Sequence, residues 1–193
     1  LRGLTSTTGD EGCASVEAPA PRDDGGESAP TEKLDPAKTY TLTFETSCGT
    51  FVVTLDQALA PNNAASLVSL ARAGFFDDTV FHRIALGFVI QGGDPLQSGM
   101  GGPGYTVVDK PKPDSQYVRG VVAMAKTELE PAGTGGSQFF VVTGDDIGLP
   151  PDYAIVGKVT EGQSVVDTIG QLGNQDQQPL QPIVIDKVTV GES

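Results

Sequence analysis

The chain has 193 residues, enough for one domain of about 150 residues and a shorter tail. Its 12 Lys and Arg residues against 25 Asp and Glu residues give a net charge of −13, which opposes binding to the phosphate backbone of nucleic acids. A single histidine and two cysteines are too few for a typical zinc or iron–sulfur site, and no apolar run approaches the roughly 20 residues of a membrane-spanning helix. We therefore expect a protein that works without a metal or other cofactor.

Residues 1–37 differ in composition from the rest of the chain. The first 36 residues hold eight acidic and three basic side chains and no Phe, Tyr or Ile. Such a segment cannot bury enough apolar surface to offset the entropy lost on ordering. Because all eight Phe and all four Tyr lie between Tyr40 and Tyr153, we expect residues 1–37 to be a largely disordered acidic tether and residues 38–193 to be the folded domain.

The tether and the cysteines bear on where the protein works. The sequence begins at Leu1 rather than Met, and an acidic, Pro-rich leader is typical of what remains when a signal or membrane anchor is removed. We therefore expect an extracytoplasmic domain, with the tail of an intracellular protein as the alternative. A bridge between Cys13 in the tether and Cys48 in a turn would fit an oxidising compartment, and two unrelated free thiols are the other interpretation.

The first half of the domain predicts a β-hairpin followed by a helix. Residues 39–46 alternate between apolar and polar side chains, and residues 50–56 run back as a second strand after a turn. The next stretch has the spacing of an amphipathic helix, with Asn62 or Asn63 as its N-cap and Gly74 at its end. The apolar stripe of this helix comprises Ala64, Leu67, Val68 and Ala71.

The rest of the domain is rich in short β-type runs separated by glycines. These runs cover residues 79–84, 87–92, 120–125, 139–143, 153–159 and 182–190, and a second helix is predicted at 162–172. Eight or so short strands with two widely spaced helices predict a mainly β fold, an antiparallel barrel capped by the helices.

Two stretches, residues 81–105 and 133–146, hold most of the side chains that carry chemistry. In the first, Arg83 lies in an apolar run, where a cation is costly unless it is paired or reaches a cleft, and His82 points to the opposite face. The Gly-rich sequences of this stretch match no phosphate-binding motif and are interpreted as tight turns. In the second, Ser137 has no nucleophile-elbow motif, and a hydrolase would have to use His82 as its base.

Several motifs in these stretches together resemble one family. FHRI, GFVIQGGDP, GGPGY, GSQFF and VGKV follow one another in the order found in the cyclophilin family of peptidyl-prolyl cis–trans isomerases, and the similarity covers about residues 40–190. The resemblance implies an eight-stranded closed antiparallel β-barrel capped by two α-helices. It also implies proline-containing polypeptides as partners, no cofactor and a monomer.

The reaction of this family fits a site without a strong base. Rotation about a peptide bond faces a barrier of roughly 20 kcal/mol that arises from amide resonance, and a guanidinium can lower this barrier by donating a hydrogen bond to the prolyl nitrogen. By the resemblance, the catalytic residues are Arg83, Phe88 and Gln91, and the substrate-binding residues are His82, Val89, Met124, Ala125, Gln138, Phe140, Leu149 and Tyr153.

The sequence departs from the best-known members of the family at several positions. Val89 stands where a Met is common, Tyr153 where a His is frequent, and Gly148 where many members carry a Trp that binds cyclosporin. We therefore expect only weakened affinity for cyclosporin-like ligands. Lys126 replaces a common Asn, and a longer loop at 126–136 is expected to alter which residues before proline are preferred.

Two further functions compete with the isomerase. A proline-peptide binding or chaperone module would use the same groove, with turnover only incidental, and loss of Arg83 would spare its partner binding. A hydrolase built on Ser137 and His82 would react with a serine-directed covalent probe.

Overall fold

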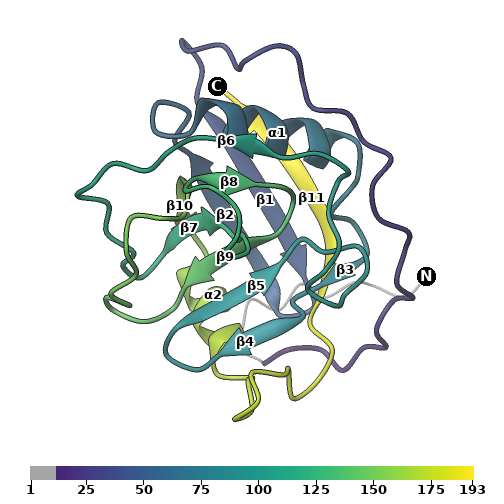
Figure 1. The fold of residues 1–193 in the computed structure, drawn as a ribbon. Coiled ribbons are helices and arrows are strands. Elements are labelled where there is room, and N and C mark those ends of the chain that lie inside the picture. Colours follow the sequence, from purple (N-terminus) through teal and green to yellow (C-terminus); the bar gives the residue numbers. More distant parts are fainter. Residues whose placement is uncertain (1–11) are drawn as a thin grey trace.

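The computed structural model describes residues 12–193, which form eleven strands and two helices (Figure 1). The strands are β1 (Tyr40–Thr46), β2 (Gly49–Leu55), β3 (Thr79–Val80), β4 (Arg83–Ala85), β5 (Val89–Gly92), β6 (Val107–Val108), β7 (Val121–Met124), β8 (Thr134–Gly135), β9 (Phe139–Val142), β10 (Ile155–Glu161) and β11 (Val184–Glu192). The helices are α1 (Pro61–Arg72) and α2 (Gln163–Gly170). Neither is long and apolar enough to cross a membrane, among the residues described.

Nine strands join in one curled antiparallel sheet in the order β3-β11-β1-β2-β10-β7-β9-β5-β4, and β6 pairs with β8 separately. The edge strands β3 and β4 are consecutive in the chain, with only Phe81 and His82 between them. The sheet therefore curls until its two edges are joined covalently. The mainly β, cyclophilin-like fold with two helices is confirmed. The structure has eleven strands rather than about eight, because Phe81 and His82 divide the run predicted at 79–84 and because the short strands β6 and β8 were not predicted. The predicted closed barrel is instead a curled sheet, since its edge strands β3 and β4 do not pair with each other.

The main core lies on the inner face of this sheet. Tyr40, Leu42 and Phe44 of β1 are buried, as their alternation predicts, and Phe44 stacks on Phe51 of β2 with ring centroids 4.8 Å apart. Both helices contribute apolar side chains to the same cluster. They therefore close the ends of the barrel, as expected.

Helix α1 is capped by a residue distant in the sequence. The prediction that Asn62 or Asn63 forms the N-cap is wrong, because Ala60 occupies that position and makes no side-chain cap. Instead the carboxylate of Asp109 accepts hydrogen bonds from the backbone N–H of Asn62 at 3.2 Å and of Asn63 at 2.7 Å. A carboxylate satisfies the free N–H groups at a helix start and complements the helix dipole there.

Residues 12–39 contain no helix or strand, and they run along one side of the domain (Figure 1). Cys13 forms a disulfide with Cys48 in the β1–β2 turn. Five backbone N–H groups of the segment donate to backbone carbonyl oxygens of the domain, those of Ala14, Arg22, Gly25, Glu27 and Thr39. The described part of the predicted tether is therefore held mainly by backbone hydrogen bonds and a covalent bond, and Cys13 and Leu34 add limited packing against the main core. Residues 1–11 of that prediction lie outside the described residues.

Candidate active site

A row of cross-strand neighbours places three of the predicted site residues on one face of the sheet. Arg83 on β4 pairs with Gln91 on β5, Gln91 pairs with Phe140 on β9, and Phe140 pairs with Ala123 on β7. Side chains that are directly opposite in a sheet project to the same face. The next residues along these strands, among them Ile84, belong to the main core on the other face. Strand alternation thus separates the site from the core.

A pocket of about 180 Å³ lies at this row. Its floor is apolar, because Val89 and Phe140 are only 1% and 4% exposed and belong to a second, smaller hydrophobic cluster. Tyr153 packs edge-on against Phe140, with ring centroids 5.6 Å apart. The lining residues are Arg83, Phe88, Val89, Gln91, Ala125, Lys126, Phe140, Leu149 and Tyr153.

The guanidinium of Arg83 is fixed at the rim of this pocket by two glutamines. Its Nε donates to Oε1 of Gln177 at 2.7 Å, and Nη1 donates to Oε1 of Gln91 at 3.0 Å. No protein oxygen within residues 12–193 accepts from its other terminal nitrogen, Nη2. Because guanidinium groups only donate, both glutamine oxygens must face Arg83. Both N–H groups of Nη2, on a permanently charged group, are thus left for a ligand.

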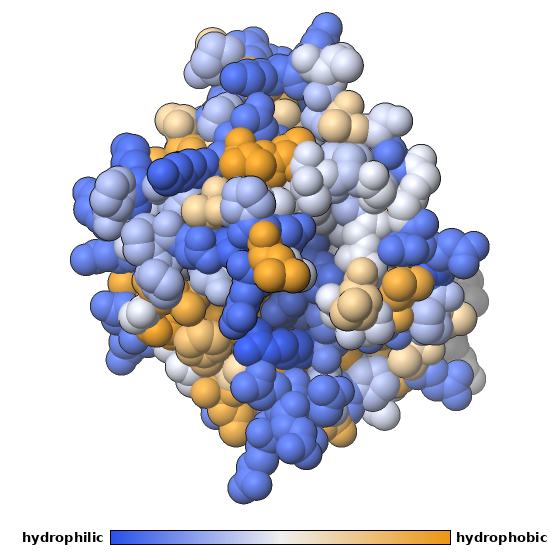
Figure 2. Space-filling model, viewed as in Figure 1, coloured by the Kyte–Doolittle hydropathy of each residue, from blue (hydrophilic) through white to orange (hydrophobic). Residues whose placement is uncertain are grey.

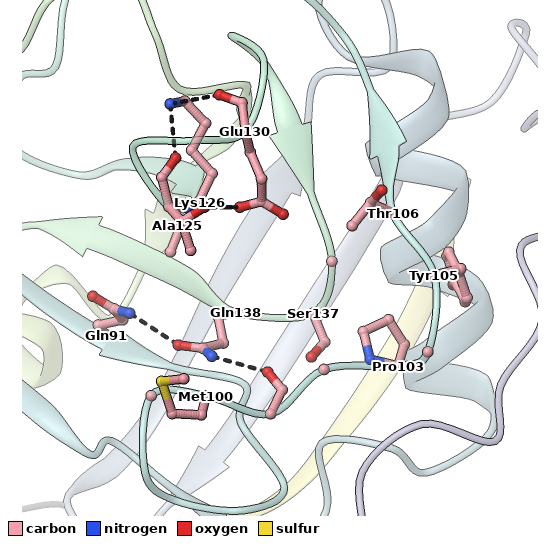
Figure 3. A pocket seen from close by; sticks show the side chains of 16 residues that line it. Gln91, Met100, Pro103, Tyr105, Thr106, Ala125, Lys126, Glu130, Ser137 and Gln138 are labelled. Carbon is pink, nitrogen blue, oxygen red and sulfur yellow. Dashed lines mark hydrogen bonds between the residues drawn. The ribbon is translucent and has the colours of Figure 1, made fainter.

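The hydrogen bonds continue from Gln91, which accepts from Arg83, into a second pocket, where Figure 3 shows them from Gln91 onward. Gln91 Nε2 donates to Oε1 of Gln138 at 3.0 Å, and Gln138 Nε2 donates to the carbonyl oxygen of Gly101 at 2.9 Å. This pocket, of about 480 Å³, shares Gln91, Ala125 and Lys126 with the first. A chain of amides therefore joins the two pockets.

Lys126 stands between the pockets with its charge engaged inside the protein. Its side chain is 3% exposed, and the ammonium forms an ion pair with Asp152. The Nζ atom also donates to the carbonyl oxygens of Thr127 at 3.2 Å and Glu130 at 3.3 Å and lies 5.4 Å from the ring centroid of Tyr153. Sequence comparison with the family marked Lys126 only as a departure, and the structure makes it a wall of both pockets.

Two residues predicted to bind substrate lie away from the pockets. Met124 is fully buried in the main core, because it alternates with Ala123 and Ala125 and so projects to the inner face. His82 lines neither pocket, its ring nitrogens have no hydrogen-bond partner, and burial lowers its pKa. His82 is therefore a partly buried residue outside both pockets.

The geometry gives no support to a hydrolase. The Ser137 hydroxyl is buried and donates to the carbonyl oxygen of Gly93 at 2.7 Å. Neither nitrogen of His82 contacts it, since both lack partners. A serine nucleophile needs a hydrogen-bonded base, and this pair does not form one.

Gln177 is the site residue that sequence reasoning missed. It lies 94 residues from Arg83, in a turn between α2 and β11, and it adopts a left-handed conformation with φ of 61°. The surrounding QDQQP sequence contains several similar glutamines and no motif. Only the folded arrangement distinguishes this one from its neighbours.

The chain is similar to known proteins along most of its length. The family described as "Cyclophilin type peptidyl-prolyl cis-trans isomerase/CLD" matches residues 41–190. A probable peptidyl-prolyl cis-trans isomerase A of Mycobacterium leprae is 36% identical over 169 residues, 78% of this chain and 91% of the relative. A human peptidyl-prolyl cis-trans isomerase-like 1 is 34% identical over 163 residues, 82% of this chain and 95% of the relative.

A solved structure agrees. A cyclophilin-type isomerase of Cryptosporidium parvum, crystallised in the presence of the dipeptide Ala-Pro, superposes with a TM-score of 0.72 at 29% identity, covering 78% of this chain and 98% of that chain. The chain therefore belongs to the cyclophilin-type peptidyl-prolyl cis–trans isomerases. The family and the enzyme class predicted from the FHR, QGGD and GSQFF motifs are confirmed.

Proposed function

We propose that Arg83 catalyses rotation about X–Pro bonds by donating a hydrogen bond from Nη2 to the prolyl nitrogen. The observation that carries this proposal is a guanidinium held from two sides at the rim of an apolar pocket, with its Nη2 nitrogen left to donate to a ligand. As the amide twists, its nitrogen lone pair relocalises and becomes an acceptor, so this hydrogen bond is stronger in the transition state than in the planar amide. The charge on Arg83 persists at any working pH.

The two pockets would bind different parts of the same peptide. The proline ring fits the smaller pocket against Phe88, Val89 and Phe140, with Leu149 and Tyr153 beside it. The chain next to proline then crosses Ala125, where the pockets meet, and a neighbouring side chain enters the larger pocket. Gln91 and Gln138 supply the polar groups that orient the peptide backbone.

The partners that suit this site are proline-containing polypeptides rather than nucleic acids, given the net charge of −13. On the face shown in Figure 2 hydrophilic side chains predominate and apolar residues form small separate groups, which supports a monomer. Affinity for cyclosporin-like ligands is weakened, because Gly148 offers no side chain for them to pack against.

The location that fits the chain best is outside the cytoplasm. The Cys13–Cys48 disulfide supports this, because such bonds persist in oxidising compartments.

The test is cis–trans exchange in a proline tetrapeptide followed by NMR, with the wild type and Arg83→Ala. We expect acceleration by the wild type and a loss of about a hundredfold or more in the variant, since one well-placed donor contributes about that much. Peptide affinity is measured on the same samples. A variant that loses affinity and rate together would favour the alternative, a binding or chaperone module, and a wild type without acceleration would overturn the proposal.

A further inference from the structure

One wall of the larger pocket is a loop that the domain itself holds from the inside, where the hydroxyl of Tyr105 also forms a hydrogen bond with that of Ser66 on α1 at 2.8 Å. This pocket loop, residues 94–106 between β5 and β6, contributes Gly99 to Thr106 to the lining. The fully buried carboxylate of Asp94 accepts from the backbone N–H of Leu96 at 2.8 Å and of Ser98 at 2.9 Å. From the pocket side, Gln138 donates to Gly101.

The N-terminal segment holds the same loop from the outside. Residues 13–39, here called the arm, run beside the pocket loop (Figure 1). The arm donates backbone hydrogen bonds to three carbonyl oxygens of the loop, and one side chain of the loop donates back. These are Arg22 N to Pro95 O at 2.9 Å, Gly25 N to Gly102 O at 2.7 Å, Glu27 N to Pro103 O at 3.0 Å, and Gln97 Nε2 to Pro19 O at 2.9 Å.

The contact is close enough to restrict the residues that can form it. A Cβ atom on Gly104 would lie 3.1 Å from the Cα of Gly25 and 3.2 Å from the backbone nitrogen of Gly26. Gly102, Pro103 and Gly104 therefore face the pocket on one side and the arm on the other. A shift of the arm would therefore displace these residues of the pocket wall.

The arm is fixed at both ends. At its start the disulfide ties Cys13 to Cys48, and Ala14 N donates to Ser47 O at 2.7 Å. At its end the chain enters β1 at Tyr40. Between these points most side chains are exposed, so little apolar burial holds the arm. Opening the disulfide would release one end and increase the entropy that docking must overcome.

We propose that the arm supports the wall of the peptide-binding site from outside and that the Cys13–Cys48 disulfide keeps the pocket loop in its binding position. That the ligand is a proline-containing peptide rests on the proposed function. Because the described residues of the arm form no hydrogen bond with the lining of the smaller pocket, its release weakens only those substrates that reach the larger pocket. The effect falls on KM rather than on kcat, since Arg83 and its glutamines stay in place.

The test compares the oxidised wild type with the double variant Cys13→Ser and Cys48→Ser on two substrates. A blocked Ala-Pro dipeptide fills the smaller pocket, and an octapeptide with a central proline extends into the larger one. For the octapeptide we expect KM to rise about fivefold with kcat unchanged, the cost of ordering a freed loop at a binding surface. For the dipeptide both constants stay within about twofold, and the amides of residues 96–104 exchange faster with solvent in the variant.

Two controls separate this role from a structural one. A reductant should reproduce the effect in the wild type and change nothing in the double variant. Arg22→Ala keeps the disulfide and removes only the hydrogen bond from Nη2 to Phe75 O, at 2.7 Å, so a smaller rise of KM for the octapeptide is expected.

A lower Tm with unchanged KM for the octapeptide would overturn the proposal, because the disulfide would then act on stability alone. If the oxidised wild type turns over neither substrate, the proposed function fails. The dissociation constant of the octapeptide then takes the place of KM, and an equal value in wild type and double variant would overturn the role of the arm.

Discussion

Gln177 accepts a hydrogen bond from Nε of Arg83 at 2.7 Å, and its own backbone oxygen accepts from Ile84 N at 2.9 Å. One residue of the α2–β11 turn therefore contacts both the side chain of Arg83 and the strand that carries it. Together with Gln91 it leaves the guanidinium a single orientation toward the smaller pocket.

Gln177→Ala should lower kcat by about tenfold and leave KM nearly unchanged, because Arg83 keeps its charge but loses one of its two supports. Exchange kinetics at several peptide concentrations measure both constants. The matched control is Gln175→Ala, an exposed glutamine of the same turn with no recorded contact to Arg83. An equal effect of both substitutions would show that the turn as a whole, and not this contact, matters.

Phe88→Ala should raise KM by about tenfold, because an apolar wall of the proline pocket is lost while the partly exposed side chain adds little to the fold. Urea unfolding of the same variant checks that stability is kept. Leu86→Ala in the same β4–β5 turn is the control, since Leu86 is 54% exposed and lines neither pocket. Unchanged KM for Phe88→Ala would remove the proline ring from this pocket.

Lys126→Met should change the preference for the residues that flank proline. The substitution keeps the length of the side chain and removes its charge, leaving the carboxylate of Asp152 without its ion-pair partner beside the pockets. The ratio of kcat/KM for a peptide with Lys beside proline to that for one with Glu should rise by several-fold, about the size expected for one charge at an interface. Lys112→Met, at an exposed position outside both pockets, should leave this ratio unchanged.

The partly buried position of His82 should make the folded protein less stable to unfolding in weak acid. Burial lowers its pKa from 6.5, an effect that Asp94 opposes and Arg83 reinforces. Above about pH 6.5 both folded and unfolded chains hold a neutral imidazole, so the group makes no difference; as the pH falls below this value, only the unfolded chain takes up the proton readily. Stability is therefore lost as the pH falls toward the folded pKa.

The measurement is the free energy of unfolding at about pH 7.5 and about pH 5.5 for wild type and His82→Gln. The wild type should lose more than the variant across this interval. Equal losses would mean that other groups, and not the buried imidazole, cause the pH dependence.

Local sequence patterns predicted the parts of the fold that depend on residues close together in the chain. The alternation of Tyr40, Leu42 and Phe44 located β1 and its buried face, and the FHR and GSQFF motifs located Arg83 and Phe140. Alternation also distinguishes Met124 from its neighbours Ala123 and Ala125 and places its side chain in the main core.

Hydrogen bonds between segments far apart in the chain were not predicted, because no local sequence pattern indicates them. Asp109 at the start of α1 and Gln177 beside Arg83 depend on how the sheet curls, which no short stretch of sequence encodes. The docking of the arm by backbone hydrogen bonds was likewise not predicted from the sequence. Its composition predicts disorder because apolar burial is scarce, whereas a disulfide and backbone hydrogen bonds, which any composition can form, dock residues 12–37 on the domain.

The central claim, that a fixed guanidinium fork performs the catalysis, is tested most directly by Arg83→Lys. Lysine keeps the positive charge but cannot hold Gln91 and Gln177 while donating a third hydrogen bond in a fixed plane. NMR exchange of the proline tetrapeptide should show kcat reduced by about tenfold or more, with the dissociation constant of the peptide within about twofold of the wild type. Full activity of Arg83→Lys would contradict the claim, because charge alone would then suffice.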